Sequence, residues 1–167
     1  MGRITIFWID LPNNWKNAYK MEIRKVSEEF AVECFKGGID CSQIVMGYAS
    51  NKLGINPNEA LRLSAAFGGG MWQGRTCGCV VAALMALGYK YGYSEPGSTA
   101  QKNELLAKKA EFERRFAEAH KSVVCREILG HDLSKPEEMA RIMEKNLLFT
   151  VCPKAVCTTC ALLDDLL

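Results

Sequence analysis

The chain has 167 residues, of which 49% are hydrophobic and 24% charged, and this length and composition predict one globular domain with a substantial core. Its net charge of +2 is too small to favour binding to nucleic acid or to an anionic membrane. The apolar stretch ITIFWIDL contains Asp10 and is too short for a signal peptide or a membrane span, so we expect a cytoplasmic protein without membrane insertion.

The amino-terminal segment, residues 1–20, differs in composition from the rest of the chain. Its stretch RITIFWIDL is rich in residues that favour strands, so we expect a strand or a short extended arm there. We place the main domain, which is helical and cysteine-rich, at residues 21–167. From Glu22 to Phe35 apolar residues recur at steps of three and four, which predicts an amphipathic helix that ends at Gly37 and Gly38.

The middle of the chain predicts two further helices, a glycine-rich loop and a central helix. One helix begins near Asp40 and ends at Gly54, and Asn56 can cap the next, which has Pro57 at its first position. The loop Gly68–Gly70 follows. The nearly all-apolar sequence TCGCVVAALMALGYKYGY then predicts a helix buried at the centre of the domain.

The carboxyl-terminal part shows the same helical signals. The break EPGST supplies a cap for a long helix that ends near Lys121, and VVCREILG predicts a short amphipathic helix. Ser134 and Glu137 have the spacing of a capping box, and Pro153 stands at the start of a last helix. Because no strands alternate with these helices, the predicted fold class is all-α, a compact helical bundle around a buried central helix.

The eight cysteines are the unusual feature of the composition. In a cytoplasmic chain with a full-sized core, this number indicates metal binding or redox chemistry more than a disulfide framework. Cys34 lies on the apolar face of its predicted helix, where a core role is expected. The other group, at the predicted starts of helices, consists of Cys41, Cys77, Cys125 and Cys152. The helix dipole and the free N–H groups at such positions stabilise a thiolate, the form that binds metals and attacks disulfides.

Four sequence motifs carry a resemblance to a known family. In chain order they are CFKGGIDCSQ, FGGGMWQGRTCGCVVAALMALG, CREILGHDLS and LLFTVCPKAV. From about residue 28 to the end, the chain resembles the C-GCAxxG-C-C family of redox-active proteins. The resemblance implies a redox or iron–sulfur role, and a similar helical domain occurs in split-Soret cytochromes, which carry an iron–sulfur centre beside their haems. The family's four cysteines correspond to Cys41, Cys77, Cys125 and Cys152.

The chain departs from the family pattern around its second cysteine. The family's Cys-Gly-Ala-x-x-Gly appears here as CGCVVA, so Cys79 replaces an alanine and becomes a reserve fifth ligand. On a helix, a residue two positions from Cys77 would point away from it, so Cys79 could join the other ligands only if the loop is still extended there. Cys157 and Cys160 are further additions, and their spacing places both thiols on one face of the last helix, with a redox role and a structural role both open.

An iron–sulfur cluster requires about four converging thiolates. We therefore expect Cys41, Cys77, Cys125 and Cys152 to hold a [2Fe–2S] or a [4Fe–4S] cluster. Gly69, Gly70 and Gly78 are expected to bring backbone N–H groups close to the sulfurs. The expected function is electron transfer or redox sensing together with an unidentified redox partner protein, and no enzymatic reaction is predicted.

Other chemistries stay open at this point. Structural zinc sites usually take pairs of ligands two to four residues apart, whereas these four cysteines come from distant segments. Thiol–disulfide exchange without metal would pair Cys41 with Cys77, or Cys125 with Cys152. A purely structural or partner-binding module is a third alternative. His120 and His131 could ligate metal, although surface or capping roles are more typical of lone histidines. The sequence leaves open whether a homodimer forms through the amino-terminal arm.

Overall fold

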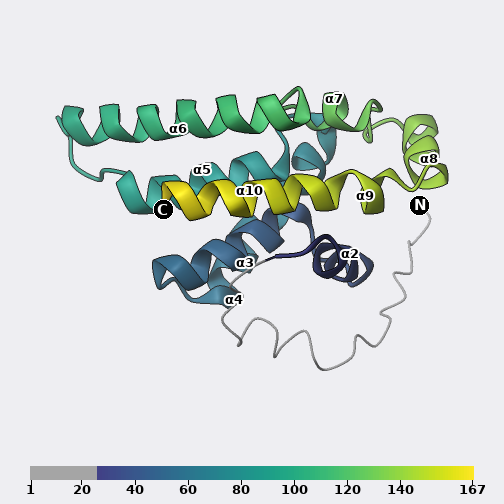
Figure 1. The fold of residues 1–167 in the computed structure, drawn as a ribbon, viewed down its shortest axis with the longest axis horizontal. Coiled ribbons are helices and arrows are strands. Elements are labelled where there is room, and N and C mark those ends of the chain that lie inside the picture. Colours follow the sequence, from purple (N-terminus) through teal and green to yellow (C-terminus); the bar gives the residue numbers. More distant parts are fainter. Residues whose placement is uncertain (1–25) are drawn as a thin grey trace, which may run out of the picture.

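A computed structural model describes residues 26–167 of the chain. The predicted arm and the first residues of the helix expected from Glu22 lie outside the described residues. Within the described part the chain is almost entirely helical and forms no strand, with a single isolated antiparallel bridge between two loops. The prediction of an all-α bundle is confirmed (Figure 1).

Three helices form the first part of the bundle: α2 (Glu28–Lys36), α3 (Cys41–Leu53) and α4 (Pro57–Ser64). Helix α2 begins later than predicted, because the Ser27 hydroxyl accepts a hydrogen bond from the Phe30 N–H at 3.2 Å and caps it. The predicted carboxyl end of α3 and the predicted amino end of α4 are confirmed. Gly54 takes a left-handed conformation after α3, and the Asn56 side chain caps α4.

The glycine-rich segment folds into two short turns, η1 (Ala65–Phe67) and η2 (Gly70–Gly74), before α5 (Gly78–Tyr91) begins. Most residues on several sides of α5 are buried, and the helix packs against α3, α6 and α10. The prediction of a buried central helix is therefore confirmed. An apolar sequence without a polar face can be accommodated only where neighbours surround the helix.

The remaining helices are α6 (Thr99–His120), α7 (Cys125–Leu129), α8 (Pro136–Glu144), α9 (Leu147–Thr150) and α10 (Cys152–Leu166). The predicted capping box of Ser134 and Glu137 is wrong. The Ser134 hydroxyl donates to the Asp132 carboxylate at 2.7 Å, and Lys135 occupies the N-cap position of α8. The local bond to Asp132 competes with the cap, as short polar side chains often do.

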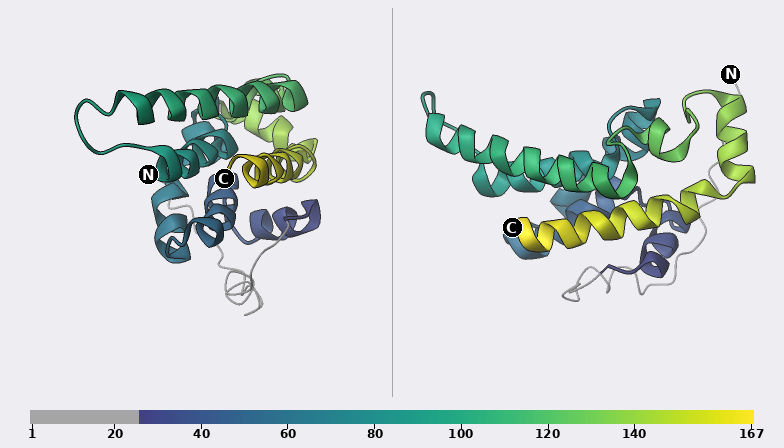
Figure 2. Two further views of the ribbon diagram at one scale, coloured as in Figure 1. Left: turned by 60° about the vertical axis from the view of Figure 1, so that its left-hand side comes forward. Right: turned by 45° about the horizontal axis from the view of Figure 1, so that its top comes forward.

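The helices lie in three layers. The pair α5 and α10 occupies the middle, α6 lies on one side of it, and α2, α3 and α4 lie on the other (Figure 1 and Figure 2). The segment Leu147–Leu166 is long and apolar enough to span a membrane by composition. In the described structure it is divided into α9 and α10, and α10 packs against α2, α3, α5 and α6 as a core helix does.

Two hydrophobic clusters make up the interior. The larger one lies among α3, α5, α6 and α10, and the smaller one is formed by Cys125, Leu129, Leu133 and Ile142, with side chains from α8 and α9 packed on it. Cysteines occur in both clusters, and five of them line the space between the clusters.

Candidate functional site

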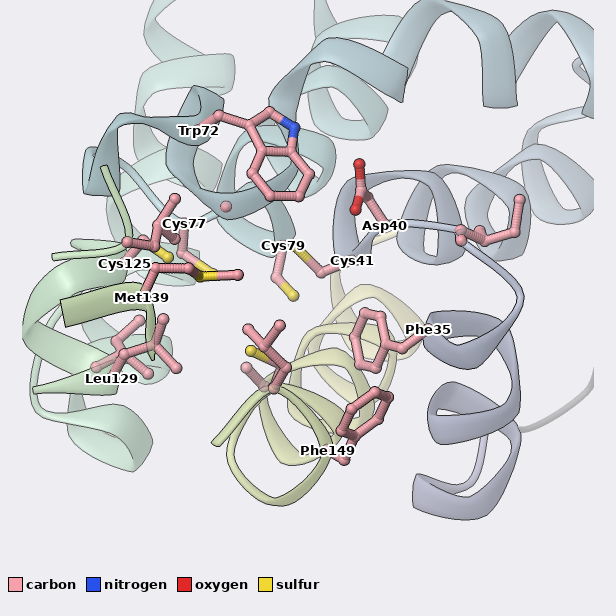
Figure 3. Close-up of a pocket in the computed structure, with 18 residues that line it drawn as sticks. Phe35, Asp40, Cys41, Trp72, Cys77, Cys79, Cys125, Leu129, Met139 and Phe149 are labelled. Atoms are coloured by element: carbon pink, nitrogen blue, oxygen red, sulfur yellow. The ribbon is translucent and has the colours of Figure 1, made fainter. Parts of the chain in front are cut away.

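A cavity of about 280 Å³ lies between the two hydrophobic clusters. Helices α2, α3, α5, α7 and α10 and the glycine-rich turn contribute to its walls (Figure 3). Five thiols line it, and they come from four helix starts that are far apart in the sequence. These thiols belong to Cys41, Cys77, Cys79, Cys125 and Cys152. The structure thus brings together all four cysteines predicted as ligands and the reserve cysteine.

Each of the four predicted ligands lies at the amino end of a helix. Cys41, Cys125 and Cys152 are the first residues of α3, α7 and α10, and Cys77 is the N-cap residue of α5. Pro153 follows Cys152 in the first turn of α10, where its missing N–H leaves no hydrogen bond unmade. The predicted placement at helix starts is confirmed for all four cysteines.

A short antiparallel contact sets Cys77 beside Cys125. Thr76 and Val124 form the isolated bridge. On either side of it, the Cys77 N–H donates to the Val123 carbonyl at 2.8 Å and the Cys125 N–H donates to the Arg75 carbonyl at 2.6 Å. The sequence gives no sign of this contact, because extended segments of two or three residues are too short to show a periodic pattern of apolar residues.

Cys79 lines the cavity, and the condition expected for this, a chain that is not yet helical at Cys77, is met. Cys79 lies within α5, but Cys77 is the N-cap residue with φ −55° and ψ 136°, outside the helical conformation. Helical spacing therefore does not relate the directions of the two side chains. The thiols of Cys41, Cys77 and Cys79 interact with one another in the cavity wall (Figure 3).

Gly78 makes the close packing of these thiols sterically feasible. A Cβ atom at this position would lie 2.7 Å from the Cys41 Sγ and 2.7 Å from the Phe67 carbonyl oxygen. Any side chain here would force apart the starts of α3 and α5. The prediction that Gly78 allows close backbone approach to a sulfur agrees with this geometry.

The other two predicted glycines have different positions. Gly69 lines the cavity with φ 56°, and its backbone N–H hydrogen-bonds to the Cys41 thiol. Gly70 is buried outside the cavity wall, where a Cβ would lie 2.6 Å from the backbone nitrogen of Arg75. Gly70 therefore shapes the turn, and Gly69 alone of this pair contacts a cysteine.

The glycine turn continues in a left-handed conformation through two larger residues. Met71 and Trp72 have φ values of 57° and 54°, which costs energy for any residue with a Cβ. The turn places Trp72 in the cavity wall while 54% of this residue stays exposed (Figure 3). The indole thus lies between the thiol-lined space and solvent.

Apart from the thiols, the described residues that line the cavity are almost all apolar, and Asp40 is the only charged one among them. Burial, with a contribution from the neighbouring Cys41, raises the pKa of Asp40 to about 6. Neither histidine reaches the cavity. His120 packs on Phe116 with ring centroids 4.7 Å apart, and the His131 Nε2 lies 3.1 Å from the Lys145 Nζ. Sulfur is therefore the dominant donor.

The helix starts do not lower the pKa of every thiol, contrary to expectation. The interaction with Cys77, reinforced by burial, raises the pKa of Cys41 to about 12, and burial raises that of Cys125 to about 12. Burial also raises the pKa of Cys152 well above its ordinary value. Only Cys77 has a lowered pKa, because Cys41 and Cys79 hydrogen-bond to its thiolate. Without a cation, mutual repulsion and burial outweigh the helix dipoles.

The other three cysteines lie away from the cavity wall. Cys34 is half-buried on α2. The Cys157 thiol donates to the Val26 carbonyl at 3.4 Å, and Cys160 is buried within the larger hydrophobic cluster. The pair on α10 thus occupies packed surroundings that suit a structural role.

The five cavity thiols surround a space that is larger than a single metal ion. Among residues 26–167, no group of three or more Cys, His, Asp or Glu side chains is arranged to hold one metal ion. The cavity therefore lacks the tight tetrahedron of a preformed structural zinc site.

Comparison with protein families gives the wider context for this thiol-lined cavity. Residues 39–166 match the family model described as "Putative redox-active protein (C_GCAxxG_C_C)". The chain belongs to this family. The matched region contains all five cavity cysteines, so the redox activity in the family's description and the cavity concern the same part of the chain. No curated protein and no solved structure matches the chain.

Proposed function

We propose that the chain holds an iron–sulfur cluster in this cavity and acts in electron transfer or redox sensing. The observation that carries the proposal is the convergence of four cysteines from four separate helix starts on one apolar space. The proposed ligands are the thiolates of Cys41, Cys77, Cys125 and Cys152.

The donor set suits such a cluster. Iron–sulfur clusters are held mainly by cysteine thiolates, and soft sulfur ligands favour them over hard cations. Among the described residues the cavity is lined by five thiols, the thioether of Met139 and one carboxylate, with no imidazole, and it is about 280 Å³ in volume. Zinc would require four of these sulfurs to close around one point, an arrangement that the described residues do not have.

The surrounding residues would stabilise negative charge on the sulfurs. The Gly69 N–H hydrogen-bonds to Cys41, and the Cys79 N–H hydrogen-bonds to Cys77. Such bonds, with the amino ends of the helices, offset the charge of thiolate ligands and raise the reduction potential. The apolar walls limit access of water. A bound cluster would supply one-electron transfer, which an unidentified redox partner protein would receive or provide.

Anaerobic reconstitution tests this proposal. The full chain is incubated with ferrous iron, sulfide and a thiol reductant, desalted, and analysed for iron, sulfide, zinc and visible absorption. We expect bound iron and sulfide in equal amounts, together with the visible absorption of thiolate-to-iron charge transfer. The same analysis of Cys152→Ser should show little iron or sulfide, because the variant lacks one ligand.

Cys160→Ser is the matched control, because it replaces a thiol on the same helix, α10, outside the cavity. This variant should load as the wild type does. Zinc bound without sulfide, or equal loading of the two variants, would contradict the proposal.

Metal-free thiol–disulfide exchange is the second candidate, because the thiols of Cys41 and Cys77 interact directly. It predicts reversible two-electron cycling of protein that takes up no iron or sulfide under anaerobic conditions.

A further inference from the structure

Cys79 is a fifth thiol in a cavity where a cluster needs about four. It lies two residues after Cys77, in the sequence CGC. It is also completely buried, at 0% exposure, whereas Cys41 and Cys77 are 8% and 6% exposed. Cys79 is therefore a buried cavity thiol beyond the four proposed ligands.

The surroundings of Cys79 place it against one predicted ligand in particular. Its thiol interacts with the thiols of both Cys41 and Cys77. A Cβ on Gly78, the residue before it, would lie 2.7 Å from the Cys41 Sγ, so the first turn of α5 abuts that sulfur. Figure 3 shows the Cys79 side chain beside that of Cys41.

Two alternative pairings are less favoured by the backbone. A Cys77–Cys79 bond would close a ring across the single residue Gly78, where disulfide geometry is strained. A Cys41–Cys77 bond would draw Cys77 away from Cys125, beside which the hydrogen bond from the Cys77 N–H to the Val123 carbonyl holds its backbone. Cys79 and Cys41 belong instead to two helices, α5 and α3, that pack closely together.

We propose that Cys79 is a resolving thiol for Cys41. In the metal-free protein, a small-molecule disulfide such as glutathione disulfide converts the two residues into an intramolecular disulfide, and a dithiol reductant reverses the change. The disulfide removes Cys41 from the ligand set and so closes the site to a cluster. This last consequence rests on the proposed function, whereas the disulfide itself does not.

The reaction has two steps that balance. The more exposed Cys41 loses its proton and attacks one sulfur of glutathione disulfide, whose S–S bond breaks as the Cys41–glutathione bond forms and one glutathione leaves. Cys79 then loses its proton and attacks the Cys41 sulfur, which releases the second glutathione. Two electrons pass from the two cysteines to glutathione disulfide, and the two protons end on the two released thiols.

Disulfide mapping tests the inference on the full chain. Metal-free reduced protein is treated anaerobically with glutathione disulfide, the remaining thiols are alkylated, and the digest is analysed by mass spectrometry. We expect the Cys41 peptide to be joined to the peptide that contains Cys77 and Cys79, with fragmentation showing the bond at Cys79 and the alkyl group at Cys77. A bond from Cys41 to Cys77 would overturn the inference.

Cys79→Ala provides the decisive variant, because alanine lacks the thiol and is smaller than cysteine. In this variant Cys41 should keep its glutathione adduct instead of forming an internal disulfide. Cys79→Ser gives the same test with a side chain of similar size if the alanine variant folds poorly by circular dichroism. Cys160→Ala, which alters a buried thiol outside the cavity, should still form the wild-type disulfide. An unchanged internal disulfide in both Cys79 variants would also overturn the inference.

Cluster loading separates this inference from the proposed function. Reduced Cys79→Ala should load iron and sulfide as the wild type does, and oxidised wild type should lose that capacity until a dithiol restores it. If Cys79→Ala alone fails to load, Cys79 is a ligand and the resolving role is contradicted. If no form of the protein loads a cluster, the proposed function fails, and the disulfide map still decides the role of Cys79.

Discussion

Two groups of cysteines in this molecule have different surroundings. The cavity group lies at the starts of α3, α5, α7 and α10, beside a space that its members share. The α10 pair, Cys157 and Cys160, lies in the interior of one helix and packs against neighbouring elements. Position in the fold therefore distinguishes candidate ligands from packing residues. A count of thiols or a C-x-x-C spacing does not make this distinction.

Two carboxylates extend the comparison to charge. Burial raises the pKa of Asp40, in the cavity wall, and no cationic side chain among the described residues lowers it. Asp164, on α10, accepts a hydrogen bond from the Tyr48 hydroxyl, and its Oδ1 lies 2.6 Å from the Lys52 Nζ. Burial raises the pKa of Asp164, but these two partners outweigh burial and lower it. Among residues 26–167, no cation thus compensates the Asp40 carboxylate, whereas Lys52 compensates that of Asp164.

The largest effect is expected for Gly78→Ala. Its Cβ would clash with the Cys41 Sγ and the Phe67 carbonyl, so we expect a loss of about 1–3 kcal/mol in the free energy of unfolding and reduced cluster loading. Gly88→Ala is the control in the same helix, because a Cβ there meets nothing within 4 Å, and it should stabilise the protein by about 0.5–1 kcal/mol. Denaturant unfolding of both metal-free variants measures the difference; equal stabilities would contradict the packing of α5 against Cys41.

A smaller effect is expected for Asp40→Asn, measured on metal-free protein as a function of pH. The folded-state pKa of Asp40 is raised to about 6 from an ordinary value of 3.8, so its contribution to stability is fully present at low pH and is lost as the pH rises through that interval. Asparagine keeps the N-cap and avoids this loss. The variant should be more stable than wild type above pH 6 by roughly 1 kcal/mol, allowing for partial solvent screening.

At the lower end of that interval the two proteins should have similar stability. If Asp40→Asn is less stable than wild type at neutral pH, a favourable interaction of the Asp40 carboxylate has been overlooked, and the contrast with Asp164 is lost.

The smallest effect is expected for Asp164→Asn, with the opposite sign. The pKa of Asp164 is lowered in the folded state, so its contribution to stability is present above its ordinary pKa and is lost as the pH falls through the folded-state value. Removing the charge weakens the ion pair with Lys52, which is partly exposed, and should cost about 0.5–1 kcal/mol near pH 7. Thermal unfolding of Asp164→Asn and wild type at pH 7 and in acid checks both the sign and the disappearance of the difference.

Features fixed by local chemistry were predictable from the sequence. Asn56, Pro57 and Gly54 mark helix boundaries through their own backbone and side-chain preferences, and the structure has these boundaries. The apolar run of α5 likewise predicted a central helix. The capping box at Ser134 failed because the Ser134 hydroxyl donates its hydrogen bond to a neighbouring carboxylate, that of Asp132. Local signals fail where two local partners compete for one group.

Features of the site that depend on distant contacts were not predictable in the same way. Helix starts singled out Cys41, Cys77, Cys125 and Cys152, but the bridge between Thr76 and Val124 has no sequence pattern. The direction of Cys79 depends on the non-helical backbone of Cys77. The raised pKa values of the cavity thiols follow from burial and from neighbouring thiols, which only the folded chain supplies.

Iron anomalous diffraction from crystals of anaerobically reconstituted protein tests the central claim most directly. We expect iron in the cavity, bonded to the Sγ atoms of Cys41, Cys77, Cys125 and Cys152, and no metal at the α10 pair. Iron bound at Cys157 and Cys160, or a cavity without iron in protein that still undergoes redox cycling, would contradict it.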